Sequence, residues 1–97
     1  MEQRKLRLRR EALAWREVGG ETVALDLDAS LYFAANSSGS LLWESLAAGA
    51  TRDTLVSRLV QTYGIEPEVA ATDVDEFVAA LEANGLLEIE GESAASS

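Results

Sequence analysis

The chain has 97 residues, of which 47% are hydrophobic, and this composition predicts one compact domain rather than a disordered segment. It contains no cysteine and no histidine, which excludes disulfides, thiol chemistry and the most common metal ligands. The formal net charge of −9 argues against nucleic-acid binding, because phosphate contacts require a basic surface.

The N-terminal segment is basic, since six of the eight lysine and arginine residues lie within the first sixteen positions. We expect residues 1–12 to be a basic arm, in which residues 6–8 are compatible with a short strand. The first residues are not followed by an apolar signal core, and no stretch is long enough to span a membrane. The sequence therefore predicts a cytoplasmic protein.

Residues 13–35 have the pattern of a three-stranded antiparallel meander. Gly19-Gly20 is a hairpin turn signal between the first two strands. The second strand alternates Val23, Leu25 and Leu27, which predicts a half-buried strand with these side chains inward. After a turn at residues 28–30, the third strand is Leu31-Tyr32-Phe33-Ala34-Ala35.

The rest of the chain is predicted to be helical. Ser37 or Ser38 is expected to cap a helix over 38–48, Thr51 to cap one over 51–63, and Pro67 to begin a third that runs to about Asn84. A short extended segment then packs back, and residues 90–97 are expected to be a disordered tail. The predicted core comprises Trp15, Leu25, Leu42, Trp43, Leu46, Leu55 and Leu59.

Three strands followed by three helices make an α+β fold, and the two helices joined by a short glycine-containing turn make it winged helix-turn-helix-like. This content raises DNA binding as a rival function. The second helix would read the groove, but it offers only Arg52 and Arg58 against Asp53, which is little for base recognition.

No catalytic constellation is present in the sequence. The densest carboxylate group is Asp73, Asp75 and Glu76, which reads as a solvated helix face because a metal site there would need oxygen ligands from outside the helix. No glycine pattern makes a phosphate loop. We therefore expect a protein that is not an enzyme and that uses no cofactor or metal.

The third strand presents a choice. Residues 31–35 contain neither charge nor proline, the usual guards of a sheet edge, so an unpaired edge here would suggest a docking site. The alternative is that the N-terminal arm covers this edge. Alternation places Tyr32 and Ala34 on one face and Leu31, Phe33 and Ala35 on the other, without indicating which face meets the third helix.

Several motifs in a fixed order resemble the PqqD-like family. They are the aspartate-ended strand Val23-Ala24-Leu25-Asp26, the tyrosine-bearing strand that closes on Asn36, Gly39 and Trp43, the following "GAT", and a final helix ending in "GLL". The resemblance covers about residues 6–89, with the domain itself expected at 13–89. The family's usual leucine before the asparagine is Ala35 here, which implies either extra room in a cleft or a repacked core.

Members of this family that act as RiPP recognition elements bind the leader peptides of ribosomally made, later modified peptides. The resemblance implies that a precursor leader adds as a fourth strand beside residues 31–35, in a cleft against the third helix. The implied peptide-binding residues are Leu31, Tyr32, Phe33, Ala34 and Ala35 on the strand, and Asp73, Val74, Glu76, Phe77, Val78 and Leu81 on the helix. For the apolar helix residues, core packing is the alternative, whereas Asp73 and Glu76 could steer a basic leader.

The resemblance further implies a stand-alone leader-binding protein of lasso peptide biosynthesis, whose partners would be a leader peptidase and a cyclase. An alternative in the same family is a chaperone that delivers a precursor to a radical-SAM enzyme of pyrroloquinoline-quinone or related biosynthesis. A small winged-helix regulator is the alternative of another class. No nucleic-acid or membrane partner is expected.

Overall fold

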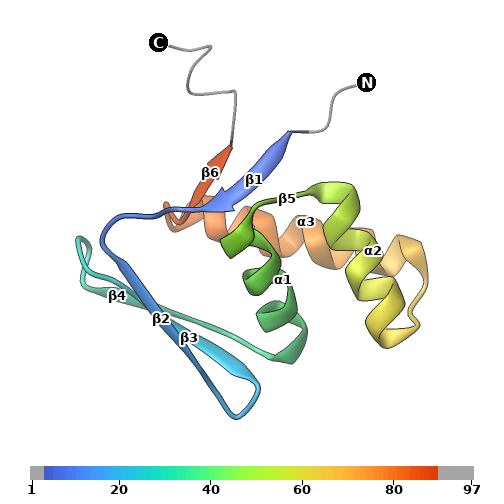
Figure 1. Cartoon of the computed structure of the whole chain (residues 1–97), viewed down its shortest axis with the longest axis horizontal. Helices are drawn as coiled ribbons and strands as arrows, with labels where there is room; N and C mark the ends of the chain where they lie inside the picture. The colour runs from blue at the N-terminus through green and yellow to red at the C-terminus, as the bar shows by residue number, and fades with distance from the viewer. Residues whose placement is uncertain (1–3, 90–97) are drawn as a thin grey trace.

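The computed structural model describes residues 4–89, which form an α+β fold as predicted (Figure 1). The elements in chain order are β1 (Lys5–Leu8), β2 (Leu13–Val18), β3 (Glu21–Asp26), β4 (Leu31–Ala35), α1 (Ser37–Ala48), β5 (Ala50–Thr51), α2 (Arg52–Tyr63), α3 (Pro67–Ala83) and β6 (Leu87–Ile89). The tail at residues 90–97 and residues 1–3 lie outside the described residues.

The predicted meander is confirmed as an antiparallel sheet in the order β2-β3-β4. Gly19 and Gly20, with φ of +60° and +83°, connect β2 to β3, and two positive φ angles are what a tight hairpin turn between twisted strands requires. Across the sheet, Trp15 pairs with Ala24, which pairs with Phe33.

The inward face of β3 differs from the prediction. Thr22, Ala24 and Asp26 are buried, whereas Leu25, assigned to the core from sequence, is 43% exposed on the outer face. Polar partners on the inside explain the difference: the Thr22 and Ser40 hydroxyl oxygens are hydrogen-bonded at 2.6 Å, and Asp26 binds an arginine. Buried polar groups that are hydrogen-bonded cost little free energy, so the alternation of apolar residues does not determine which face of β3 points inward.

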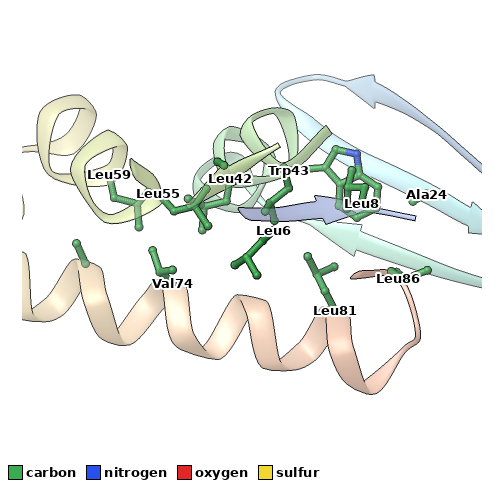
Figure 2. Packing of buried hydrophobic residues seen from close by; sticks show 13 residues of the cluster. Leu6, Leu8, Ala24, Leu42, Trp43, Leu55, Leu59, Val74, Leu81 and Leu86 are labelled. Carbon is green, nitrogen blue, oxygen red and sulfur yellow. The ribbon is translucent and has the colours of Figure 1, made fainter. Parts of the chain in front are cut away.

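Residues 5–8, assigned from sequence to a basic arm, lie inside the fold. β1 pairs with β5 on one side and with β6 on the other, which makes a second three-stranded sheet in the order β5-β1-β6. Leu6 and Leu8 are buried in the core (Figure 2). The alternation of Leu6 and Leu8 with charged residues lets this strand bury one face, so the basic side chains do not keep it outside the domain.

The three helices are bounded by local capping signals. The side chain of Asn36, rather than of Ser37 or Ser38, caps α1 by accepting from the Gly39 N–H at 3.0 Å. Thr51 caps α2 as predicted, accepting from the Thr54 N–H at 3.2 Å, and Pro67 lies in the first turn of α3.

The helices and both sheets share one core. Five of the residues predicted for it, Leu42, Trp43, Leu46, Leu55 and Leu59, are at most 2% exposed. Trp15, also predicted to be buried, is 44% exposed, because β2 is an edge strand and its indole covers the side of Trp43 from outside. The core thus has an accessible aromatic margin at the meander sheet.

Candidate functional site

β4 is an open edge of the meander sheet. In the described range 4–89 no strand pairs with its outer side, and β1, which could have covered it, instead pairs with β5 and β6. The alternative of a covered edge is therefore wrong. β2 is the other edge, but it carries Arg16 and Glu17, and charged side chains guard an edge against pairing.

The inner face of β4 is directed at α3. The Phe33 ring lies 6.1 Å from the Phe77 ring of α3 and 5.9 Å from the Trp43 ring of α1, measured between centroids. Tyr32, on the opposite face, is 73% exposed. The question left open by the sequence is thus answered: the face of Phe33 and Ala35 meets the last helix.

Four aromatic rings from four elements are linked along this junction. Trp15 of β2 contacts Trp43 edge-on at 5.6 Å, Trp43 stacks with Phe33, and Phe33 meets Phe77 edge-on. Such ring pairs stabilise an arrangement by about 0.5–1.5 kcal/mol beyond burial. We call these four residues the aromatic cluster; it fixes how far β4 stands from α3.

At the end of β4, the elements α1, β4 and α3 approach one another closely around Gly39. A Cβ placed on Gly39 of α1 would lie 2.8 Å from the Ala35 Cβ and 3.2 Å from a Phe77 ring carbon. Only glycine permits this distance without displacing a neighbour. Ala35 is 7% exposed and packs beneath α1, so the small side chain at this position serves the core rather than an open space.

Two pockets lie near the junction of β4 with α3. The first, a small cavity of about 10 Å³, is at the start of β4 and the end of α3; the second, of about 360 Å³ and more open, lies between the start of α1 and the middle of α3, just beyond the end of β4. The first is lined by Leu13, Ala24, Asp26, Leu31, Tyr32, Phe33, Asn84 and Leu86. The second is lined by Asn36, Ser38, Gly39, Leu42, Leu59, Asp73, Glu76 and Phe77.

Arg9 links the segments around the first pocket by hydrogen bonds. Its guanidinium donates to both carboxylate oxygens of Asp26, at 2.7 and 3.3 Å, and to the carbonyls of Ala12 and Gly85. The hydrogen bonds from Arg9 and from the Ala29 N–H lower the pKa of the Asp26 carboxyl, and the same ion pair raises the pKa of Arg9. One side chain thus ties the end of β3 to the turn after α3, and this explains physically why the strand ends in aspartate.

The residues predicted on α3 divide between cleft and core. Asp73, Glu76 and Phe77 line the second pocket. Val74 and Leu81 are 0% exposed and point from α3 into the core (Figure 2), the alternative that the sequence left open for them. Val78 is partly buried against the same core.

Sequence reasoning missed several lining residues. Leu13, Asn84 and Leu86 come from segments predicted as an ordinary strand, a helix end and a short extended segment, and Asn36 and Gly39 were cited as marks of the family resemblance without being assigned to the site. The spacing of Phe77 and Asn84 by seven residues places both on one helix face, which is the signal that could have extended the site to Asn84.

Other features of the described part of the chain are plain. Residues 4–89 contain no group of three or more carboxylates, histidines or cysteines that could hold a metal ion. None of the helices within this range is long and apolar enough to cross a membrane.

Comparisons with known proteins find a matching family model and two solved structures similar to this chain. A family model described as Coenzyme PQQ synthesis protein D (PqqD) matches residues 21–87. A structure of TbiB1 in complex with the TbiA(beta) leader peptide is 26% identical with a TM-score of 0.77, and the match covers 84% of this chain and 94% of that one. No curated protein matches the chain.

A second solved structure shares the fold. It is lasso peptide synthetase B1 complexed with the leader peptide, at 24% identity and a TM-score of 0.75, with 86% of this chain and 96% of that one covered. The family match spans all of β3, β4 and the three helices, which are the elements that build the cleft.

Proposed function

Because this chain belongs to the PqqD family and is a PqqD-like RiPP recognition element, we propose that it binds the leader peptide of a ribosomally made precursor as an added strand on β4, in the cleft against α3. The proposal includes Leu31 to Ala35 of β4 and Asp73, Glu76 and Phe77 of α3 as the contact residues. The single observation that carries it is the unguarded outer edge of β4, whose Phe33 ring meets the Phe77 ring of α3.

The energetics indicate that apolar contacts beside the edge, and not strand pairing alone, set the affinity. Each backbone hydrogen bond to an added strand contributes about 0.5–1.5 kcal/mol, whereas ordering a flexible leader costs about 2–5 kcal/mol and association costs more. Strand pairing by itself is therefore weak and independent of sequence. Burying one or two apolar side chains, at about 1.5–3 kcal/mol each, supplies the remaining affinity and the selectivity.

Strand addition is tested by methylating the peptide backbone one residue at a time. The probe is a labelled leader taken from a short precursor gene beside this one, titrated by fluorescence polarisation. Only every second amide of an edge-bound strand faces β4, so N-methylation is expected to abolish binding at alternate positions over one stretch. A uniform loss, or none, would contradict pairing with β4.

The contribution of the cleft wall is tested with Phe77→Ala. Removing this ring opens the space between β4 and α3, so we expect leader affinity to fall about tenfold or more. Tyr63→Ala is the matched control, because Tyr63 is an aromatic residue of α2 that lines neither pocket. Thermal unfolding of both variants separates a loss of binding from a loss of fold. Equal, negligible leader binding by wild type and Phe77→Ala would count against the proposed function.

We further propose that the bound leader is presented to the leader peptidase, and to the cyclase, of a lasso peptide pathway. The absence of His and Cys from the chain supports a division of labour in which separate enzymes do the chemistry. The family model's own description favours a second candidate, a peptide chaperone for a radical-SAM enzyme. Neighbouring genes discriminate the two: a peptidase and an asparagine-synthetase-like cyclase, or a radical-SAM gene.

A further inference from the structure

The outer face of the meander sheet is apolar, and we infer that it is the interface of a homodimer in which two copies of this chain pack sheet against sheet. The inference goes beyond the proposed function and does not depend on it. Both β4 edges stay open in such a dimer, because face-to-face packing of sheets uses side chains and leaves the backbone groups of the edge strands free.

The meander sheet points hydrophobic side chains outward. Eight positions of β2, β3 and β4 alternate with the inward ones and point away from the helices, and all eight are exposed. Six of the eight are hydrophobic: Ala14, Val18, Val23, Leu25, Tyr32 and Ala34. An antiparallel sheet with one solvated face normally carries polar residues on that face. β3 does the reverse, since it buries Thr22 and Asp26 and exposes the apolar residues between them, and this indicates that a partner covers the face.

The apolar face is large enough for a specific contact. Val18, Leu25 and Tyr32 are 56%, 43% and 73% exposed. Together the six hydrophobic residues present on the order of 500 Å² of accessible surface, whereas the largest apolar patch of a typical monomer is about 300–600 Å² and is often functional. With the two other residues of the face the area is roughly 700 Å² per copy, near the about 800 Å² that each partner buries in a standard interface. This size fits a reversible dimer of two such faces.

The two charged residues of the face complement each other. Arg16 and Glu21 occupy the remaining outward positions, and neither forms an ion pair with another residue in the range 4–89. A two-fold dimer can pair Arg16 of one copy with Glu21 of the other, and the symmetry repeats that pair. The face therefore offers its own copy a charge partner that the single chain does not provide.

The net charge of −9 opposes self-association only weakly at this face. The face itself is neutral, and α3, which carries Asp73 and Glu76, packs on the inner side of the sheet. Repulsion between exposed charges is largely screened beyond about 8 Å at physiological salt. An acidic face would favour a basic partner, whereas a neutral face with one charge of each sign suits a second copy of this chain.

The second copy also contributes to the leader site, a consequence that rests on the proposed function. Tyr32 and Ala34 belong both to β4 and to the outer face. A guest strand beside β4 turns alternate side chains to that same face, where the second copy lies. Leader binding and dimer formation therefore support one another instead of competing.

The test measures the mass of the full chain by sedimentation equilibrium from about 1 to 500 µM at physiological salt, and wild type is expected to pass from the mass of one chain to that of two with a midpoint on the order of 10–100 µM. Val23→Thr/Leu25→Thr should stay monomeric, because threonine keeps the strand preference and removes apolar surface. Tyr63→Thr/Val69→Thr changes two exposed apolar residues of α2 and α3 and is the matched control, which should dimerise like wild type.

A charge exchange tests the same face without removing apolar surface. Arg16→Glu gives each face two negative charges and should weaken the dimer about tenfold or more. Arg16→Glu/Glu21→Arg restores neutrality and should recover most of the affinity. Thermal unfolding at about 1 µM, where every form is monomeric, confirms that each variant is folded.

Three results would overturn the inference: a wild type that stays monomeric at the highest concentration, a dimer that survives Val23→Thr/Leu25→Thr, or a dimer that added leader dissociates, since the contact would then lie on the β4 edge. A monomeric wild type whose Val23→Thr/Leu25→Thr variant loses binding to a purified enzyme of the same gene cluster would also overturn it and assign the face to that enzyme. Absence of leader binding by every form would overturn the proposed function and not the dimer.

Discussion

At the scale of single residues, Asp26 is the charge on which the cleft depends most. It is 8% exposed and held by Arg9 and by two backbone N–H groups, whereas Asp75 and Arg52 form a pair in which both side chains are about half exposed. Asp26→Asn is expected to lower the free energy of unfolding clearly more than Asp75→Asn, since exposed pairs contribute about 0–1 kcal/mol.

Because the pKa of Asp26 is lowered in the folded state, the contribution of Asp26 to stability is complete above the ordinary carboxyl pKa of about 3.9 and is lost as pH falls through the folded value. Urea unfolding of wild type and Asp26→Asn between pH 7 and pH 3 should show a constant difference down to about pH 5 that shrinks below pH 4; a difference that does not depend on pH would contradict the ion pair.

At the scale of elements, β1 is a structural strand of the domain despite its basic sequence. Leu8 is 2% exposed between the two sheets, so Leu8→Ala should destabilise the fold by about 2–5 kcal/mol. Leu25→Ala, the same substitution on the outer face of β3, should cost less than about 1 kcal/mol. Chemical denaturation measures both, and similar losses for the two variants would argue against the inward and outward faces described here.

The elements also show how far sequence alone could go. The meander, the three helices and the Thr51 cap follow from local patterns, because turn glycines, capping side chains and helical periodicity act within a few residues. Which face of β3 points inward does not follow from local patterns. It depends on the hydrogen bonds that Ser40 and Arg9 make to β3, and both residues are distant from β3 in sequence. The same holds for β5, a strand of two residues that exists only because β1 pairs with it. For the candidate site, the sequence pointed to β4 and Phe77. It could not assign Val74 and Leu81 to the core, because that assignment depends on which face of α3 packs inward.

At the scale of the whole molecule, the two sheets lie on different parts of a flat body of 38 × 37 × 19 Å (Figure 1). Within residues 4–89 the edge strand β4 carries no charged side chain, whereas the edge strand β6 of the other sheet carries Glu88, so a bound leader should change the side of the molecule at β4. Hydrogen–deuterium exchange with saturating leader is expected to slow in β4 and the adjoining part of α3 and to stay unchanged in β1 and β6. Protection spread evenly over both sheets would instead indicate general tightening of the fold.

The aromatic cluster has a practical consequence. Both tryptophans of the chain belong to it: Trp43 is fully enclosed, with no acceptor for its indole N–H among residues 4–89, and Trp15 is half open to solvent at its side. Tryptophan fluorescence therefore reports mainly on the junction of β4 with α1, because Phe33 stacks on Trp43. The two tryptophans are an intrinsic fluorescent probe, and a shift in their emission can report peptide binding without a dye on either partner.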